Sequence, residues 1–261
     1  QFLLNVADPQ DFTLFILISV MVSVAAVPIL LTVIATPHIE ETERVSIAHL
    51  WRRAPMGVIG IILSQWMASV VFGMGAVYAT KMGMSVSEVA FFMGSMMAGG
   101  MILQWPLGKL SDHMDRRWVL GGASIVALIA ALAASGETVA SDKLYILAFV
   151  FGGFCLSLYS IVAALTNDHL RPSEIVPASG TMVLLAGLTS ITGPITVAFW
   201  MDVFGLDSFF LVLAVALFFM AVISIWRVLT IPALPEEYKT LSSIQVATNP
   251  VGTVLHAEEE H

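Results

Sequence analysis

Residues 108–120 read GKLSDHMDRRWVL and place five charged residues between two intervals that contain no Asp, Glu, Lys or Arg, 89–108 and 118–136. Each interval has about the 20 residues that a helix needs to cross a bilayer. Working outward along the chain gives five more such intervals, at residues 12–39, 54–80, 144–167, 175–201 and 208–226. None alternates polar and apolar residues as a membrane β-strand does. The sequence therefore predicts an all-α membrane protein with seven transmembrane helices.

The composition indicates that most of the surface of this chain faces lipid rather than water. Hydrophobic residues make up 58% and charged residues 11%, whereas a soluble domain has about 25% charged residues. The 11 Lys and Arg residues form no cluster larger than a pair, and the net charge is −8. Nucleic-acid binding is excluded because it needs a basic surface.

The basic residues predict the orientation. Only Lys81 and Lys143 lie in loops on one side of the predicted helices. The other nine basic residues lie on the opposite side: Arg44, Arg52, Arg53, Lys109, Arg116, Arg117, Arg171, Arg227 and Lys239. Basic loops stay in the cytoplasm, so we expect a multi-pass bacterial inner-membrane protein with a cytoplasmic C-terminus. Seven spans then place the N-terminus outside. Together with a first residue, Gln1, that is not Met, this predicts a fragment of a longer protein.

The loop at 108–117 resembles the signature loop of the major facilitator superfamily, Gly-x-Leu-Ser/Ala-Asp-basic-x-Gly/Asp-Arg-Arg/Lys. Seven positions match this pattern: Gly108, Leu110, Ser111, Asp112, Asp115, Arg116 and Arg117. His113 departs from it, because the family more often has Arg or Lys at that position. Residues 159–172, Gly187 and Gly193-Pro194 are similar to the tenth and eleventh helices of an uncharacterised bacterial subgroup of that family.

The resemblance implies that the first span is the family's sixth helix and that the last six spans form one six-helix bundle of its fold. The chain would then divide into an outer segment with the first span (1–35), a cytoplasmic linker (36–55), the C-terminal bundle (56–231) and a disordered cytoplasmic tail (232–261). In the linker, Ile47, Leu50 and Trp51 share one helical face. That spacing fits either an amphipathic helix on the headgroups or a solvated loop.

The resemblance implies the C-terminal portion of a secondary active transporter that moves a small solute by alternating access, and no enzyme activity. Its partners would be the lipid bilayer, the missing N-terminal helices, the solute and a coupling proton or ion. No cofactor or metal is expected, because the Met-rich stretch 93–101 fits adaptable packing better than a metal path.

Seven residues are candidates for gating: Gly108, Asp112, Arg116, Arg117, Asp168, Gly193 and Pro194. Gly108 lets two helices approach closely, and Asp112 can bind a neighbouring helix N-terminus or pair with Arg116. The alternative is that the arginines merely anchor the loop. Gly193-Pro194 permits a bend, which is either a flexing point or a static kink.

Three neutral residues are candidates for binding the solute. Gln65 and Ser69 lie one turn apart in the second span, and Tyr159 lies in the fifth; these two spans correspond to cavity-lining helices of the family. Serines in membrane helices also commonly bond to their own backbone. The spans contain no acid or base except near their ends, so we expect coupling in the missing half, or at Glu88 or Asp168.

Three other classes of membrane protein are possible for a chain with seven spans. A retinal protein needs a lysine inside its last span, where the only charge is Arg227 at the end. An intramembrane enzyme needs acid–base or nucleophile motifs that the sequence lacks. A membrane scaffold or assembly factor of the same family fold, without transport activity, remains the alternative.

Overall fold

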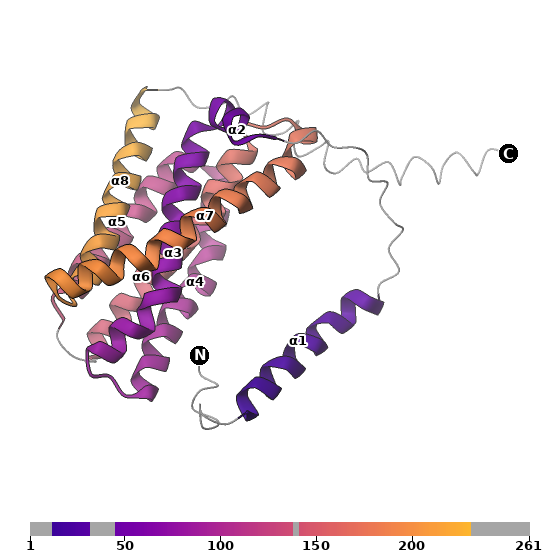
Figure 1. Ribbon diagram of the computed structural model, residues 1–261. Coiled ribbons are helices and arrows are strands. Elements are labelled where there is room, and N and C mark those ends of the chain that lie inside the picture. The colour runs from indigo at the N-terminus through magenta and orange to yellow at the C-terminus, as the bar shows by residue number, and fades with distance from the viewer. Residues whose placement is uncertain (1–11, 32–44, 138–140, 231–261) are drawn as a thin grey trace.

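The computed structural model describes residues 12–31, 45–137 and 141–230, and the regular structure of this part is entirely helical (Figure 1). The helices are α1 (Thr13–Leu31), α2 (Ile47–Arg53), α3 (Pro55–Lys81), α4 (Val86–His113), α5 (Arg116–Ser135), α6 (Asp142–Asn167), α7 (Pro172–Phe204) and α8 (Ser208–Thr230). Of these, α3 to α8 are long and apolar enough to cross a membrane. The prediction of an all-α membrane protein with a six-helix bundle is confirmed.

The helices extend beyond the charge-free intervals that predicted them. α4 continues through the first half of the signature loop to His113, and α7 runs for 33 residues. Lipid excludes charged side chains from the hydrocarbon layer but does not stop a helix from continuing into the headgroups. Charge-free intervals therefore mark the membrane core, while the capping residues mark the helix ends.

α1 is helical, as predicted, and stands apart from the bundle in Figure 1. Its uninterrupted apolar stretch within the described part is Phe15–Pro28, shorter than those of the other six spans. Most of its described side chains are exposed, so this helix needs lipid or another segment to cover it. The predicted disordered tail at 232–261 and residues 36–44 of the predicted linker lie outside the described residues.

α6 is the central helix of the bundle and packs against α3, α4 and α5. Its contact with α4 is especially close at Gly152. A Cβ atom at this position would lie 2.4 Å from the backbone oxygen of Met96. Small residues allow such backbone contact between membrane helices, where dispersion rather than the hydrophobic effect favours association.

An aromatic cluster fills the bundle at the end opposite the signature loop. Tyr78 and Phe209 stack with ring centroids 4.6 Å apart, and Phe210 lies edge-on to both rings. All three side chains are fully buried. They join α3 to the start of α8, and such ring pairs add about 0.5–1.5 kcal/mol each beyond the area they bury.

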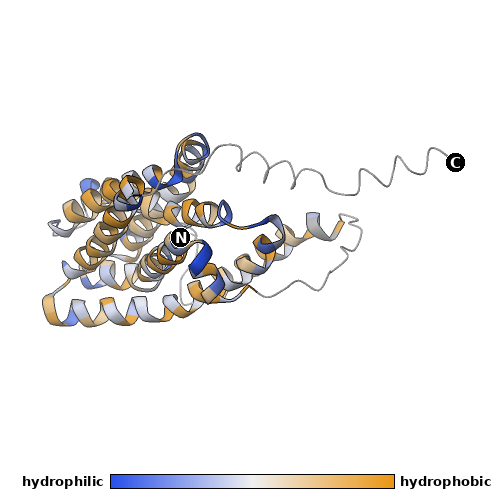
Figure 2. Ribbon diagram, turned by 90° about the horizontal axis from the view of Figure 1, so that it is seen from above, coloured by the Kyte–Doolittle hydropathy of each residue, from blue (hydrophilic) through white to orange (hydrophobic). Residues whose placement is uncertain are grey.

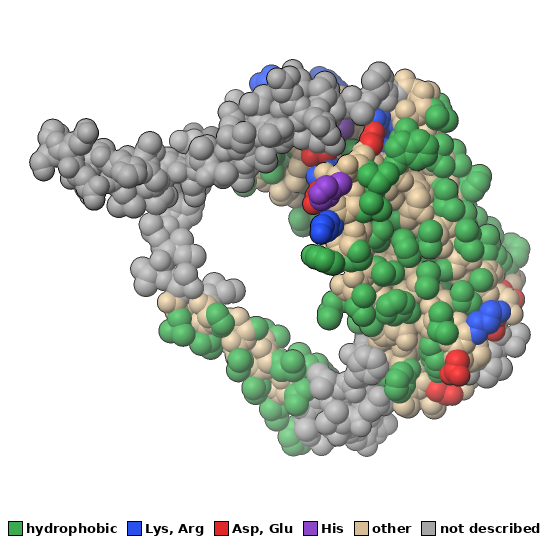
Figure 3. Space-filling model, turned by 180° about the vertical axis from the view of Figure 1, so that it is seen from behind, with side chains coloured by type: hydrophobic (Ala, Val, Ile, Leu, Met, Phe, Trp, Pro, Cys, Tyr) green, Lys and Arg blue, Asp and Glu red, His purple; other side chains and the backbone are tan. Residues whose placement is uncertain are grey.

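The sides of the bundle are apolar and its ends are polar. Hydrophobic colour dominates the long helices in Figure 2, and charged side chains gather toward two ends in Figure 3. α7 crosses the bundle obliquely in Figure 1 and is the least covered of the six bundle helices: 22% of its most apolar stretch is buried, against 39–50% in the other five.

The described part of the linker forms a helix, so the solvated-loop alternative is wrong for residues 47–53. α2 begins after Ser46, whose hydroxyl accepts a hydrogen bond from the backbone N–H of His49 at 3.2 Å. Leu50 is fully buried. His49 Nε2 lies 3.0 Å from Oε1 of Glu174 in the first turn of α7, so α2 is docked against the bundle.

Candidate functional site

The signature loop covers the end of α4, the short turn at Met114 and Asp115, and the start of α5, at what we call the motif end of the bundle. The carboxylate of Asp115 caps α5 by accepting a hydrogen bond from the backbone N–H of Arg117 at 3.0 Å. This satisfies one of the amides that the start of a helix leaves without a partner. The turn therefore holds Arg116 and Arg117 in the first turn of α5.

Arg116 joins three helices. Its Nε donates to Oδ2 of Asp168 at 2.8 Å, and its Nη1 lies 3.0 Å from both Oδ1 of Asp112 and Oγ of Ser111. The side chains of Arg116 and Asp168 are 16% and 17% exposed, whereas that of Asp112 is 63% exposed. One guanidinium is thus shared between a largely buried carboxylate and an exposed one.

The charge of Arg116 compensates an unfavourable position for Asp168 but not for Asp112. Asp168 is the C-cap residue of α6, where the partial negative charge of the helix end disfavours an anion. A charge-assisted hydrogen bond from Arg116 compensates for this placement. Asp112 is near the end of α4 and is open to solvent, so its contact with Arg116 is the one that a new partner can replace.

Arg117 has a different set of partners. Its Nε and Nη2 lie 3.0 Å and 2.6 Å from the carboxylate oxygens of Asp115, and its Nη1 donates to the backbone oxygen of Arg227 at 3.2 Å. The side chain is 11% exposed. Arg117 therefore connects the start of α5 to the end of α8, which fits the anchoring alternative, and its gating role stays a prediction.

The close helix approach expected at Gly108 is not made by any described residue. Nothing in the described part lies within 4 Å of a Cβ atom built there. Gly108 instead lines a pocket of about 140 Å³ between α4 and α6, together with Asp112, Arg116 and other residues. Within the described part, the position beside Gly108 is therefore open rather than packed against a helix.

The same pocket contains a polar pair that we did not predict. Gln104 of α4 donates from Nε2 to Oγ of Ser160 on α6 at 2.7 Å. Gln104 lies inside the charge-free interval 89–108, so the criterion that selected Gln65, an amide that is costly in lipid, would have found it.

Ser69 lies at the crossing of α3 and α7. Its hydroxyl donates to the backbone oxygen of Trp66 at 2.8 Å. A Cβ atom at Gly193 would lie 2.2 Å from Oγ of Ser69, and a Cβ atom at Gly73 would lie 2.9 Å from Pro194. The structure thus brings a predicted binding residue against the predicted bend of α7, at a point where the two helices touch.

Gln65 and Tyr159 are both half-buried, and neither side chain has a hydrogen bond within the described part. Gly57 faces Thr166 and Gly60 faces Val162 across the antiparallel helices α3 and α6. Continuing this register places Gln65 level with about Ser157, which is two residues, or about 3 Å along the helix, from Tyr159. The two candidates therefore share one level of the bundle.

Within the described residues, no three His, Cys, Asp or Glu side chains come close enough to hold a metal ion. The site consists of an ion-pair cluster at the motif end and neutral polar side chains along α3, α4 and α6. The ion-pair cluster can form and break contacts between helix ends, and the neutral side chains can hydrogen-bond to a polar molecule.

Comparison with known proteins agrees with these features. The family model of the Major Facilitator Superfamily matches residues 56–256. The chain is 28% identical to an uncharacterised MFS-type transporter of Enterobacter sp. (strain 638) over 196 residues, which are 74% of this chain and 50% of that protein. It is 25% identical to similarly described transporters of Escherichia fergusonii (76% of this chain and 51% of the relative) and Yersinia enterocolitica (82% and 56%). The chain spans about half the length of these curated relatives, and its match to the family model shows that it belongs to the Major Facilitator Superfamily.

Proposed function

We propose that this chain is the C-terminal portion of a secondary active transporter that moves a small solute across the bacterial inner membrane by alternating access. The motif end and the C-terminus then face the cytoplasm, and the remaining partners are a set of N-terminal helices and a coupling proton or ion. Support comes from relatives named as transporters, of which this chain matches about half the length. The observation that carries the proposal is the Arg116 cluster.

Asp168 is largely buried against Arg116, whereas Asp112 is exposed beside it. The Arg116–Asp112 contact is therefore the one that can form and break during transport. Asp112 is 63% exposed and its Oδ1 lies 3.0 Å from Nη1 of Arg116. A carboxylate accepts several hydrogen bonds, so Asp112 can also bind backbone N–H groups at the end of a helix in the other half. Such contacts exist in one state of the transporter and bias the equilibrium toward it.

The solute path in this proposal follows the faces of α3 and α6 that carry Gln65 and Tyr159, with the Gln104–Ser160 pair at nearly the same level. The side chains are neutral donors and acceptors, so we propose a polar solute that this half binds without ion pairing. Gly193 and Pro194 contact α3 directly. Movement at this crossing would change the shape of the path.

The gate is tested with Asp112→Asn in the complete transporter. The substitution keeps the size and removes the charge. We expect a cysteine at Ser160, in the pocket beside Asp112, to be labelled faster by a water-soluble maleimide in the variant. The coupling is expected to be about 1–3 kcal/mol. Asp142→Asn is the matched control, because Asp142 is also an exposed acid but lies at the other end of α6.

Labelling of Ser160→Cys is independent of the solute, so the test needs no known substrate. The native Cys155 is 2% exposed and contributes little background. Equal labelling rates in Asp112→Asn and the parent would contradict the gating role. An equal increase in Asp142→Asn would show a general loss of stability instead.

A further inference from the structure

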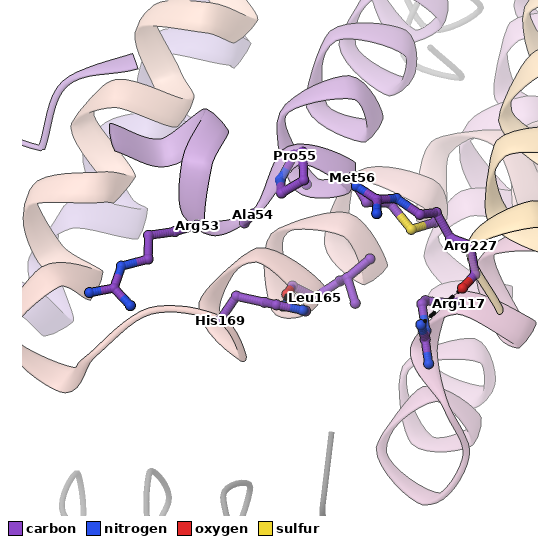
Figure 4. A pocket seen from close by; sticks show the side chains of 9 residues that line it. Arg53, Ala54, Pro55, Met56, Arg117, Leu165, His169 and Arg227 are labelled. Carbon is purple, nitrogen blue, oxygen red and sulfur yellow. Dashed lines mark hydrogen bonds between the residues drawn. The ribbon is translucent and has the colours of Figure 1, made fainter. Parts of the chain in front are cut away.

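A second pocket at the motif end is surrounded by basic side chains. It has a volume of about 190 Å³, and one water needs only about 10–15 Å³ of such space. Arg53 at the end of α2, Arg117 in α5, His169 after α6 and Arg227 near the end of α8 all line it (Figure 4). We call this space the basic pocket.

The positive charge of the basic pocket is only partly neutralised: Glu174 of α7 is near enough to Arg53 to interact with its charge, beyond ion-pair distance. Arg117 is paired with Asp115. Neither Arg53 nor Arg227 has a carboxylate within 4.0 Å among the described residues. The guanidinium group of Arg227 lies beside Met56, whereas that of Arg53 points away from Arg117 and Arg227 at the rim of the pocket (Figure 4). Arg227 therefore offers the space donors that no described carboxylate satisfies, which favours an anion.

Backbone groups add to this preference. Pro55, Met56 and Gly57, in the first turn of α3, line the pocket. No side chain caps this helix, so its first N–H groups lack the partner that a cap supplies. Their partial positive charge adds to that of the guanidinium groups.

Tryptophans indicate how deep the basic pocket lies in the membrane. Each of its arginines is within two residues of an exposed tryptophan: Trp51 precedes Arg53, Trp118 follows Arg117 and Trp226 precedes Arg227. Tryptophan side chains concentrate where the hydrocarbon meets the headgroups. Residues this close along a helix differ in depth by about 1.5–3 Å, so the pocket lies at the level of the lipid phosphates.

We propose that the basic pocket binds the phosphate group of an anionic phospholipid. A phosphate matches the planar guanidinium group of Arg227, Arg53 adds positive charge at the rim (Figure 4), and basic pockets between membrane helices are suited to anionic headgroups. A bound headgroup would connect α2, α3 and α8, and so join the linker to the bundle. The proposal does not depend on a transport activity, because it rests on the charge, shape and depth of the pocket.

The test uses the purified full chain in detergent, with phosphatidylglycerol and phosphatidylcholine of identical acyl chains. Lipid retention is measured by native mass spectrometry and binding by thermal unfolding. We expect phosphatidylglycerol to bind at least tenfold more tightly. Arg227→Gln and Arg53→Gln should each reduce this preference about tenfold, which corresponds to about 1.4 kcal/mol.

Lys109→Gln is the matched control, since it removes one positive charge from the same end of the bundle. Lys109 lies over the ring of Trp105, at 5.6 Å, and does not line the basic pocket. We expect it to change the preference less than twofold. Arg53→Gln serves if Arg227→Gln unfolds, because Arg53 is exposed at the end of a short helix.

Three results would overturn the proposal. Equal binding of the two lipids would show that the pocket does not select anionic headgroups. An equal loss in Lys109→Gln would show a diffuse attraction to the whole end of the bundle. Displacement of phosphatidylglycerol by inorganic phosphate at equal concentration would assign the pocket to a free phosphate instead.

Discussion

The unequal sharing of Arg116 between two carboxylates leads to a quantitative prediction. Asp168→Asn removes the charge from a side chain that is 17% exposed and whose Oδ2 lies 2.8 Å from Nε of Arg116. Hydrogen bonds to charged groups contribute about 1.5–3 kcal/mol, and breaking a buried ion pair costs about 3–5 kcal/mol. Because the pair is at the polar end of the bundle and partly reaches solvent, we expect a loss of about 2–3 kcal/mol.

Asp112→Asn provides the internal comparison. Its carboxylate is 63% exposed, and exposed ion pairs contribute about 0–1 kcal/mol. Unfolding of the bundle in detergent micelles with a chemical denaturant measures both losses. A double-mutant cycle of each Asp variant with Arg116→Gln then isolates the two pair energies.

The expected order is a strong Arg116–Asp168 pair and a weak Arg116–Asp112 pair. If Asp168→Asn costs less than about 0.5 kcal/mol, or if the two pairs couple equally, the assignment of one structural and one exchangeable carboxylate is wrong. A loss in either variant that persists when Arg116 is already replaced would show that the Asp acts through another partner.

Three further predictions concern packing, binding and orientation. Gly193→Ala should destabilise the bundle in thermal unfolding by about 1–3 kcal/mol, because the added methyl group overpacks the crossing of α3 and α7. Gly187→Ala is the control and should be neutral or slightly stabilising, because nothing lies within 4 Å of a Cβ atom built there. Equal effects of the two substitutions would contradict the tight crossing. Gln65→Leu should fold normally yet lose the stabilisation that a screened polar solute gives the complete transporter, and retained stabilisation would remove it from the site. A cysteine at Lys143 should react with an impermeant reagent from outside the cell and one at Arg116 should not; the reverse pattern would invert the proposed orientation.

The membrane class, the six helices of the bundle and the location of the signature loop could all be predicted from the amino-acid sequence. Lipid forces each spanning backbone to satisfy its own hydrogen bonds, so a charge-free run such as 144–167 is enough to predict the helix α6 (Asp142–Asn167). The capping Asp115 and the basic pair after it could also be read locally, because a helix start depends on residues next to it in the chain.

Tertiary structure alone decided which residues meet across helices. The sequence did not show that Arg116 would bond to Asp168, that Ser69 would lie against Gly193, or that Gln104 would reach Ser160. In a soluble helix an apolar stripe reveals the inward face. Here lipid and the bundle interior are both apolar, so hydropathy does not fix the rotation of a helix about its axis. Only close packing at small residues and the few polar contacts select that rotation, and both depend on the neighbouring helices.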